Sequence, residues 1–306
     1  MDEFILPLRG DAMEYIEYPD ESFPFTVWYD NYSRLINHGL PFHWHKSFEI
    51  LTVLTGKIDY WVSGTRYVLN PGDCLFVNSN KIHYTMSYED THDSTVFGMV
   101  LLPASLGCFP DDTCYRKFIT PVLKSPVDAV KFDVNTETGK KFKDLILQME
   151  KLDWNAYLYE LQISSRLAAL WEMILETAFM SNIEDTHSQA DRHEEEVKAI
   201  LSYIHTNYQQ NISIQDLIHV SCLSRSECFR SFKAFSNTSP IEYLNEYRLL
   251  KAADLLCHSS MNITEIFSAC GFCSSSYFGK LFRTKYGITP LQYRKKGESL
   301  GKIVTL

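Results

Sequence analysis

The sequence predicts a multidomain α+β protein: an all-β N-terminal barrel, a helical connector and a C-terminal all-α domain. Three observations carry this prediction. Short segments rich in β-branched and aromatic residues fill residues 25–102, apolar residues recur at helical spacing over 142–178, and a pattern of short, capped helices occurs twice near the end of the chain. We place the domain boundaries at 1–125, 126–192 and 193–306.

The N-terminal region alternates strand-forming segments with turn formers. Gly56, Gly64 and the Asn70-Pro71-Gly72 stretch separate the segments from one another. Closely spaced strands with no helix between them are typical of a sandwich or barrel. The predicted strands are Phe25–Tyr29, Phe48–Leu54, Lys57–Val62 and Asp73–Val77.

Two amphipathic helices are predicted in the connector, one over 142–152 and one over 167–178. Two interpretations stay open for them: they pack on their own domain, or they join two copies of the chain, because DNA-binding proteins are often dimers. Residues 181–196 almost lack large apolar side chains and are predicted to form a solvated linker.

Composition and charge indicate where the protein works. The chain starts with acidic residues and contains no apolar run of membrane-spanning length, so we expect a cytoplasmic protein with no membrane partner and eight reduced cysteines. Residues 1–192 carry 16 Lys and Arg against 28 Asp and Glu, whereas residues 197–306 carry 13 against 7. This asymmetry predicts that only the C-terminal region binds nucleic acid.

The C-terminal region contains five sequence signals for the start of a helix. In each, a capping side chain is followed three positions later by an acidic residue or glutamine, which is the pattern of a capping box. Five such signals in fewer than eighty residues predict a series of short helices. The pairs are Ser213 with Asp216, Ser224 with Glu227, Ser239 with Glu242, Asn262 with Glu265, and Thr289 with Gln292.

This helical pattern is an internal repeat. Arg230 and Lys280 are equivalent at an offset of 50, whereas Ser213 and Asn262 match at an offset of 49, so the second copy has one extra residue within Gly271–Cys273. Each copy is a helix, a tight turn and a second helix, the arrangement that places the second helix in the major groove of DNA. A long helix from Ser239 to about Cys257 is predicted to set the two copies about 34 Å apart, one turn of DNA.

The residues of this region resemble the AraC/XylS family of transcriptional regulators. The resemblance covers residues 194–296 and rests on the Ser239-Pro240…Tyr243…Arg248-Leu249 segment, on Gly271-Phe272, and on Ser276-Tyr277-Phe278…Gly287…Pro290…Tyr293-Arg294. It implies a sequence-specific transcription factor, an activator rather than a repressor, with double-stranded DNA, RNA polymerase and a second copy of the chain as partners. Ile218, Phe267, Asn237 and Cys228 depart from the family pattern, and we interpret them as packing changes.

The residues expected to contact DNA lie on the second helix of each copy. Arg230 can donate two hydrogen bonds to a guanine edge, whereas Lys280 offers a less directional donor. Hydroxyls and cations at the helix ends are expected to bind phosphates, although any one of them is equally explained as a solvated surface residue. The full set is Ser224, Arg225, Ser226, Phe229, Arg230, Lys233, Ser274, Ser275, Ser276, Lys280 and Arg283, with Lys285 beside it.

The Cys270-Gly-Phe-Cys273 segment has the spacing of a redox motif. Such motifs normally follow a strand and place their first thiol at the start of a helix, whereas Cys270 is predicted to end a helix. We therefore interpret the segment as the turn of the second repeat.

Residues 39–83 resemble the two sequence boxes of the cupin barrel, with His43, His45 and Glu49 in the first box and His83 in the second. Asn78 and Asn80 depart from the usual residues of the second box. These four side chains are suitable ligands for a divalent metal ion. Alternatively they bind an organic effector, and the resemblance to sensor barrels favours a small molecule, such as a sugar, without a cofactor. The candidate effector residues are Trp28, His43, His45, Glu49, Tyr60 and His83.

Two functions follow from these observations. The first is a transcriptional regulator, not an enzyme, that responds to a small molecule bound in the barrel. The second is a metal-dependent cupin enzyme, such as an oxygenase or isomerase, fused to a DNA-binding domain. No phosphate-binding loop, dinucleotide fingerprint or nucleophile–base pair at a recognisable spacing supports another enzyme class.

Overall fold

The computed structural model describes residues 12–89, 91–179 and 193–301. They fall into two compact units. Within these described residues, the β unit comprises Glu14–Ser33 and 43–179, and the helical unit comprises 12–13, Arg34–Phe42 and 193–301.

Two antiparallel sheets form the barrel. The five-stranded sheet has the order β1-β8-β3-β6-β9, and the four-stranded sheet has the order β2-β7-β4-β5. The all-β barrel and the four predicted strands are confirmed, and the structure adds β2, β5, β7, β8 and β9. The strands are β1 (Phe25–Asn31), β2 (Gly39–His43), β3 (Phe48–Thr55), β4 (Ile58–Val62), β5 (Thr65–Leu69), β6 (Cys74–Val77), β7 (His83–Ser87), β8 (Thr95–Leu101) and β9 (Ala129–Phe132).

Strand periodicity gives the five-stranded sheet two different faces. Successive side chains of β3 point to opposite sides, so Phe48 and Ile50 share one face and Glu49 points to the other. Phe48 and Ile50 belong to a large apolar core. The register Trp28↔Gly98↔Leu51 puts Trp28 on the same face as Glu49. One face is therefore apolar, and the other carries polar side chains into the barrel.

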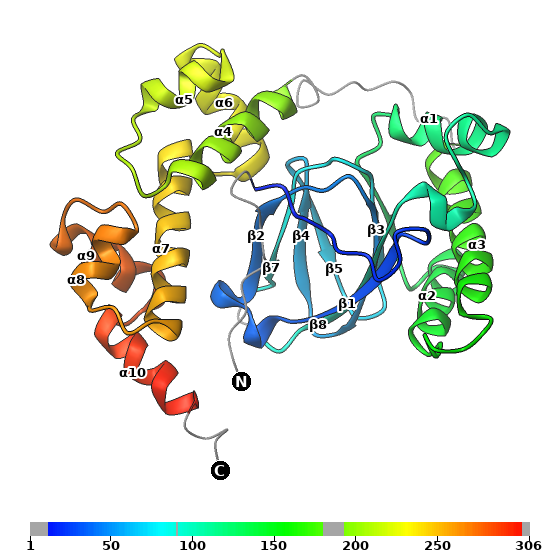
Figure 1. Ribbon diagram of the computed structural model, residues 1–306, viewed down its shortest axis with the longest axis horizontal. Helices are drawn as coiled ribbons and strands as arrows, with labels where there is room; N and C mark the ends of the chain where they lie inside the picture. Colours follow the sequence, from blue (N-terminus) through cyan, green and yellow to red (C-terminus); the bar gives the residue numbers. More distant parts are fainter. Residues whose placement is uncertain (1–11, 90, 180–192, 302–306) are drawn as a thin grey trace. The chain divides into compact units, whose positions relative to one another are not determined.

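The two predicted connector helices are α2 (Glu137–Glu150) and α3 (Tyr159–Phe179), and they cover the apolar face of the five-stranded sheet (Figure 1). Their aromatic and aliphatic side chains share one core with the strands: Phe142 stacks on Phe132 with ring centroids 3.8 Å apart, and Trp171 lies 4.8 Å from Phe48. Between β8 and β9 the chain forms the short helical segments Pro103–Leu106, Tyr115–Ile119 and α1 (Thr120–Leu123).

The helical unit has two helix-turn-helix pairs, α5–α6 and α8–α9, and the long helix α7 lies between them (Figure 1). The five predicted starts are confirmed: side-chain and backbone hydrogen bonds close all five capping boxes. The helices are α4 (Glu194–Asn207), α5 (Ile214–Ser221), α6 (Arg225–Ser236), α7 (Pro240–His258), α8 (Ile263–Ala269), α9 (Ser275–Tyr286) and α10 (Pro290–Gly301).

The two turns differ by the predicted extra residue. A left-handed residue follows each first helix: Cys222, directly after α5, has a φ of 54°, and Gly271, after Cys270 at the end of α8, has a φ of 79°. Three positions separate Cys222 from the start of α6, and four separate Gly271 from the start of α9. Because Leu223 and Phe272 still correspond, the extra residue is Cys273.

The predicted linker is shorter than expected at its C-terminal end. Residues 194–196, predicted to belong to the linker, form the first turn of α4 instead. Three glutamates in the first turn stabilise a helix, because their negative charges interact favourably with the positive end of the helix dipole. The charge of this segment therefore indicates the start of a helix and not a linker. Residues 181–192 lie outside the described residues. Within the described ranges, every helix is too short or too polar to cross a membrane.

Candidate nucleic-acid interface and buried histidine site

The second helix of the first repeat, α6, has one buried and one exposed face. Cys228, Phe232 and Phe235 are buried and hold the helix against its neighbours. The predicted DNA contacts Arg225, Ser226, Arg230 and Lys233 are exposed, and Phe229 is half-buried. The guanidinium of Arg225 lies 5.7 Å from the centre of the Phe229 ring, so these two side chains form one surface.

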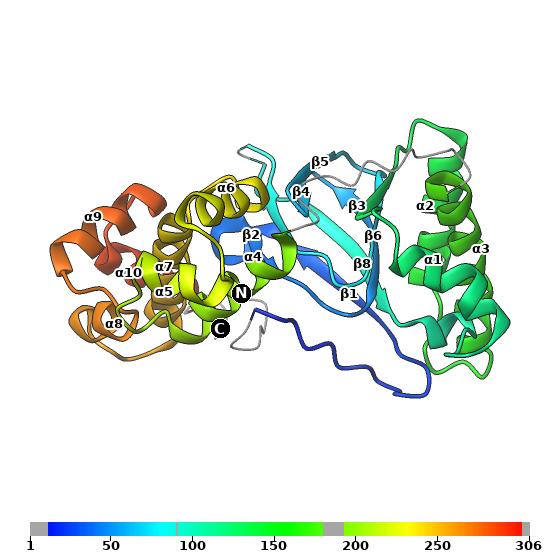
Figure 2. The same ribbon diagram turned by 90° about the horizontal axis from the view of Figure 1, so that it is seen from above.

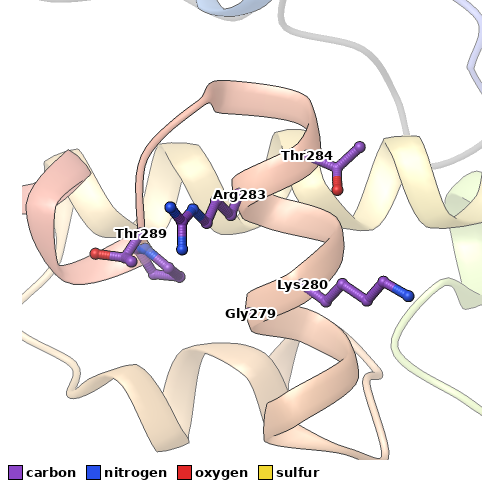
Figure 3. A pocket seen from close by; sticks show the side chains of 6 residues that line it. Gly279, Lys280, Arg283, Thr284 and Thr289 are labelled. Atoms are coloured by element: carbon purple, nitrogen blue, oxygen red, sulfur yellow. The ribbon is translucent and has the colours of Figure 1, made fainter.

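The second helix of the second repeat, α9, repeats this division. Phe278 and Phe282 are buried, whereas Ser275, Ser276 and Lys280 are exposed. Lys280 and Arg283 line a shallow hollow with Gly279, Thr284, Thr289 and Pro290, and Figure 3 shows the Arg283 side chain pointing toward Thr289 at the start of α10, whereas Lys280 extends from the other side of α9. Seen from above in Figure 2, α6 and α9 lie on the same side of α7. One surface of the helical unit thus presents both predicted reading helices.

The two cap serines have a structural role beside the predicted phosphate contacts. Ser224 Oγ donates to Glu227 Oε2 at 2.5 Å and accepts from the Glu227 amide, and Ser274 Oγ accepts from the Tyr277 amide at 3.3 Å. These bonds fix where α6 and α9 begin, so they also fix which side chains are exposed. The hydrogen bonds from Ser224 hold the pKa of the Glu227 carboxyl below its usual value, which keeps this capping group ionised.

A buried arginine of α7 ties the two repeats together. Arg248 is 8% exposed, and its Nε and Nη2 donate to the carbonyl oxygens of Tyr208 and Gln210 at 2.7 and 2.6 Å. The same guanidinium lies 5.8 Å from the ring of Phe272, in the turn of the second repeat. Arg248 therefore links the end of α4, the spacer helix and the second turn.

The structure places Cys270 and Cys273 in the turn of the second repeat, as predicted. Cys270 ends α8, is fully buried and is not disulfide-bonded, whereas Cys273 is exposed. Burial raises the pKa of the Cys270 thiol to about 12, the opposite of what a redox-active cysteine requires.

Inside the barrel, three histidines and Glu49 form a buried polar cluster. The side-chain nitrogens of His43, His45 and His83 lie within 4.8 Å of one another. Glu49 Oε2 is 3.4 Å from His45 Nε2 and 3.3 Å from His83 Nε2, and it accepts a hydrogen bond from Tyr60 Oη at 3.1 Å. Five of the six predicted effector residues are thus brought together.

Electrostatics in this cluster favour an ionised Glu49. Burial alone would raise the pKa of this carboxyl, but hydrogen bonds and charge interactions with His45 and His83 outweigh burial and hold the pKa well below its usual range. Burial lowers the pKa of His45, but the hydrogen bond and the charge of Glu49 raise it. The pKa of His45 is therefore higher than its usual value.

Trp28, the sixth predicted effector residue, occupies a different place. Its indole lies against Gly98 of β8, where a methyl group added to Gly98 would come within 2.1 Å of the ring. It shares the inward face of the sheet with Glu49, but the strand register places it beside Leu51, two positions further along β3.

Glu14 is an acidic residue near this cluster that was not predicted from the sequence. Glu14 Oε2 lies 3.8 Å from His43 Nε2 and 3.9 Å from His45 Nε2. Burial, the largest influence, raises the pKa of the Glu14 carboxyl. No spacing rule identifies this residue, because it lies far from the histidines in the sequence.

The cluster fits a divalent metal ion chemically. Three imidazoles and a carboxylate are the ligands that zinc, iron, nickel and manganese take in proteins. His83 Nε2 is buried and lies 3.3 Å from Glu49 Oε2, so these two possible ligand atoms are already close together. His83 Nδ1 is bound to the carbonyl oxygen of Lys81 at 2.8 Å, which orients the ring as metal-binding histidines are oriented.

Comparison with known proteins supports the assignment of both domains. A helix-turn-helix domain model matches residues 217–296, and a cupin domain model matches residues 37–97. The chain is 28% identical over 284 residues to the uncharacterized HTH-type transcriptional regulator YdeC of Bacillus subtilis (strain 168), covering 92% of this chain and 95% of that protein. It is 26% identical over 265 residues to the HTH-type transcriptional activator RhaS of Enterobacter sp. (strain 638), covering 86% and 90%.

A solved AraC-type DNA-binding domain from Chromobacterium violaceum is 30% identical and covers 35% of this chain and 96% of its own, with a TM-score of 0.33. The duplicated helix-turn-helix, the two domain matches and the full-length relatives agree with one another. The chain is a transcriptional regulator in which a cupin domain precedes a DNA-binding helix-turn-helix domain, and it resembles the AraC/XylS family.

Proposed function

We propose that this regulator activates transcription by binding one DNA duplex with both second helices, in response to a small molecule held in the barrel. One observation carries the proposal: α6 and α9 are the equivalent helices of the two repeats and lie on one side of α7. Each buries one face against the helical unit and exposes cationic side chains on the other. In this proposal Arg230 and Lys280 contact bases, and Lys233 and Arg283 contact phosphates. The protein works in the cytosol, where it meets the chromosome and RNA polymerase.

A mobility-shift assay tests the DNA-binding surface. The probe is the DNA upstream of the protein's own gene, and the variant is the double substitution Arg230→Ala with Lys280→Ala. We expect at least a tenfold loss of affinity, because each well-placed base contact is worth about 1–3 kcal/mol. The matched control removes one arginine and one lysine from exposed sites of the β unit, Arg116→Ala with Lys141→Ala. Equal affinities of the two double variants would refute the assignment of these helices.

For the barrel, we propose that the polar cluster holds a small polar effector such as a sugar. Buried Glu49, Tyr60 and the histidines offer both donors and acceptors, and a hydroxyl-rich ligand can use both. All five tryptophans precede residue 180, so tryptophan fluorescence reports on the β unit alone. A sugar that binds there should raise the temperature of the fluorescence transition, since a ligand stabilises the folded state by mass action. A shift that persists in Glu49→Gln would place the ligand elsewhere.

A divalent metal ion is the second candidate for the same site, and the three imidazoles gathered next to Glu49 favour it. A bound metal would polarise or activate a ligand at the open coordination position, whether the domain senses that ligand or, in the enzymatic alternative, transforms it. Metal analysis of the purified protein separates the two candidates. Stoichiometric metal that is lost in His43→Ala supports the metal site, and a metal-free wild type that binds its effector supports the organic site.

We further propose a homodimer formed through the segment that precedes α3 and the first turn of α3. Trp154, Tyr157, Leu158 and Leu161 are large apolar side chains that expose 74%, 97%, 48% and 67% of their surface. A cluster of this kind marks an interaction site more often than a solvated surface. Light scattering should give a dimer for the wild type and a monomer for Trp154→Ser with Leu161→Ser. A wild-type monomer at all concentrations would exclude this dimer.

A further inference from the structure

Glu14 reaches the histidine cluster from outside the cupin match, which begins at residue 37. Its side chain is 14% exposed. The backbone amide of Glu14 donates to the carbonyl oxygen of Trp44 at 2.9 Å, and Trp44 stands between His43 and His45. The backbone therefore fixes Glu14 beside the segment that carries these two histidines.

The contacts of Glu14 are too long for hydrogen bonds. Its Oε2 lies 3.8 and 3.9 Å from the two imidazole nitrogens, whereas direct hydrogen bonds to oxygen are about 2.7–3.2 Å long. Two ligands of one metal ion, each about 2.1 Å from it, lie roughly 3.0–4.2 Å apart. The Glu14–histidine and Glu49–histidine distances all fall in this range. The histidine nitrogens, within 4.8 Å of one another, need only a small inward movement to meet a common ion.

The charges of the surroundings point the same way. Glu14 and Glu49 place two carboxylates next to three imidazoles in a largely buried space. Asp30 of β1 is a third acidic residue, close enough to interact electrostatically with Glu14 and Glu49. Buried carboxylates are costly unless a positive charge compensates them, and a divalent cation supplies two.

We propose that Glu14 is a ligand of a divalent metal ion, completing with His43, His45, His83 and Glu49 a site of three imidazoles and two carboxylates. This inference rests on the metal candidate proposed above and makes its chemistry specific. Five protein ligands suit ions that prefer six-coordination, such as Mn²⁺, Fe²⁺, Co²⁺ or Ni²⁺, and leave one position for water or a small ligand. Zn²⁺, which is usually four-coordinate in proteins, suits this set less well.

The test is a titration of metal-stripped, full-length protein with Co²⁺, followed by visible absorption and by metal analysis. The ligand-field bands of Co²⁺ gain intensity as its coordination number falls, so they report the number of ligands without any activity assay. For the wild type we expect one Co²⁺ with the weak bands of a six-coordinate ion. Glu14→Gln should bind Co²⁺ at least tenfold more weakly and with more intense bands, because a neutral amide is a poor ligand.

Two further variants make the result specific. Glu17→Gln removes an exposed carboxylate from the same segment and should leave affinity and spectrum unchanged. Glu14→Asp keeps a carboxylate on a shorter side chain and should bind with intermediate affinity, which also controls for folding. Wild-type affinity and spectrum in Glu14→Gln would overturn the role of Glu14 while the metal site stands. A wild type that binds no Co²⁺ would remove the metal candidate and this inference together, while DNA binding by the same sample would leave the regulator intact.

Discussion

Arg248 Nε donates to the carbonyl oxygen of Tyr208 at 2.7 Å, joining the spacer helix to the residue that ends α4. Its Nη2 reaches the carbonyl oxygen of Gln210 from the same guanidinium. Both carbonyl groups belong to the connection that leads into the first helix-turn-helix, and Phe272 of the second turn lies against the guanidinium. One side chain thus joins the connection into the first helix-turn-helix to the turn of the second.

Arg248→Met should destabilise the helical unit by about 3 kcal/mol, because two carbonyl groups lose a charged donor in a buried place. Arg248→Lys should lose less stability than Arg248→Met, because its single nitrogen can still donate to one of the two carbonyl groups. The far-UV circular dichroism transition should shift to lower urea concentration, while the tryptophan fluorescence transition of the β unit serves as the internal control. A shift of both transitions by the same amount would mean that the two units do not unfold separately.

Arg230 and Lys233 lie on the same exposed face of α6, but we expect different effects on DNA binding. Arg230→Ala should cost about 1–3 kcal/mol on the preferred sequence and relax the preference at one base pair. Lys233→Ala should weaken binding to all sequences and lower the slope of log K against log salt by about 1. Binding titrations at four salt concentrations, on specific and scrambled DNA, separate these effects. If Lys233→Ala changed base preference and Arg230→Ala did not, their roles would be reversed.

Gly98→Ala should destabilise the barrel, because the indole of Trp28 occupies the space of the added methyl group. Forcing the ring aside should cost about 1–3 kcal/mol, as overpacking does elsewhere. The fluorescence transition should fall accordingly. Trp28→Leu combined with Gly98→Ala should lose less than the sum of the single changes, since the smaller side chain leaves room. Strict additivity would show that the clash is relieved in another way.

The helical unit was predictable from the sequence almost residue by residue. Capping boxes, the left-handed Asn237 and Gly287, and the duplicated spacing are local signals, and local hydrogen bonds determine helix ends. Several strands were not predicted, because their sequences lack a clear alternation: β2 contains Pro41, and β7 begins with the buried polar His83. These strands form through pairing with neighbours that are distant in sequence, which a local pattern does not encode.

The barrel site was predictable only in part, for the same reason. His43, His45, Glu49 and His83 follow a known spacing, and strand alternation turns them to one side. Glu14 and Asp30 join them through the packing of separate segments, so the sequence alone gave no reason to select them. Trp28 shows the opposite case, since an aromatic residue on the correct face of the sheet packs on Gly98 rather than on the cluster.

His205 of α4 should make the helical unit sensitive to acid. The imidazole is 3% exposed, its Nε2 lies 2.6 Å from Tyr243 Oη, and its ring stacks on Tyr247 with centroids 3.9 Å apart. Burial, with a smaller contribution from the charge of Lys251, lowers the pKa of His205 from 6.5 to about 3. The folded protein therefore keeps this histidine neutral at pH values where the unfolded chain binds a proton.

The sign of the pH effect follows from this difference. Between pH 6.5 and about 3 the unfolded state binds more protons at His205 than the folded state, so stability is complete above pH 6.5 and falls as the pH is lowered through this window. At pH 5 the loss amounts to about 2 kcal/mol relative to neutral pH. In the helical unit the shifted carboxyl groups, Asp216, Glu227 and Glu242, all have lowered pKa values and act mainly below pH 4.5, so for this unit the range from 4.5 to 6.5 isolates the histidine.

His205→Phe removes the titrating group and keeps a ring against Tyr247. It should be less stable at pH 7.5, because Tyr243 loses its hydrogen-bond partner, but its stability should change much less between pH 7 and pH 5. Urea titrations followed by circular dichroism at several pH values measure both quantities. The exposed His219→Phe is the matched control and should retain the wild-type pH dependence, because this side chain lies at the surface of α5 and not in the core. An equal slope in His205→Phe and the wild type would show that the buried imidazole is protonated without cost.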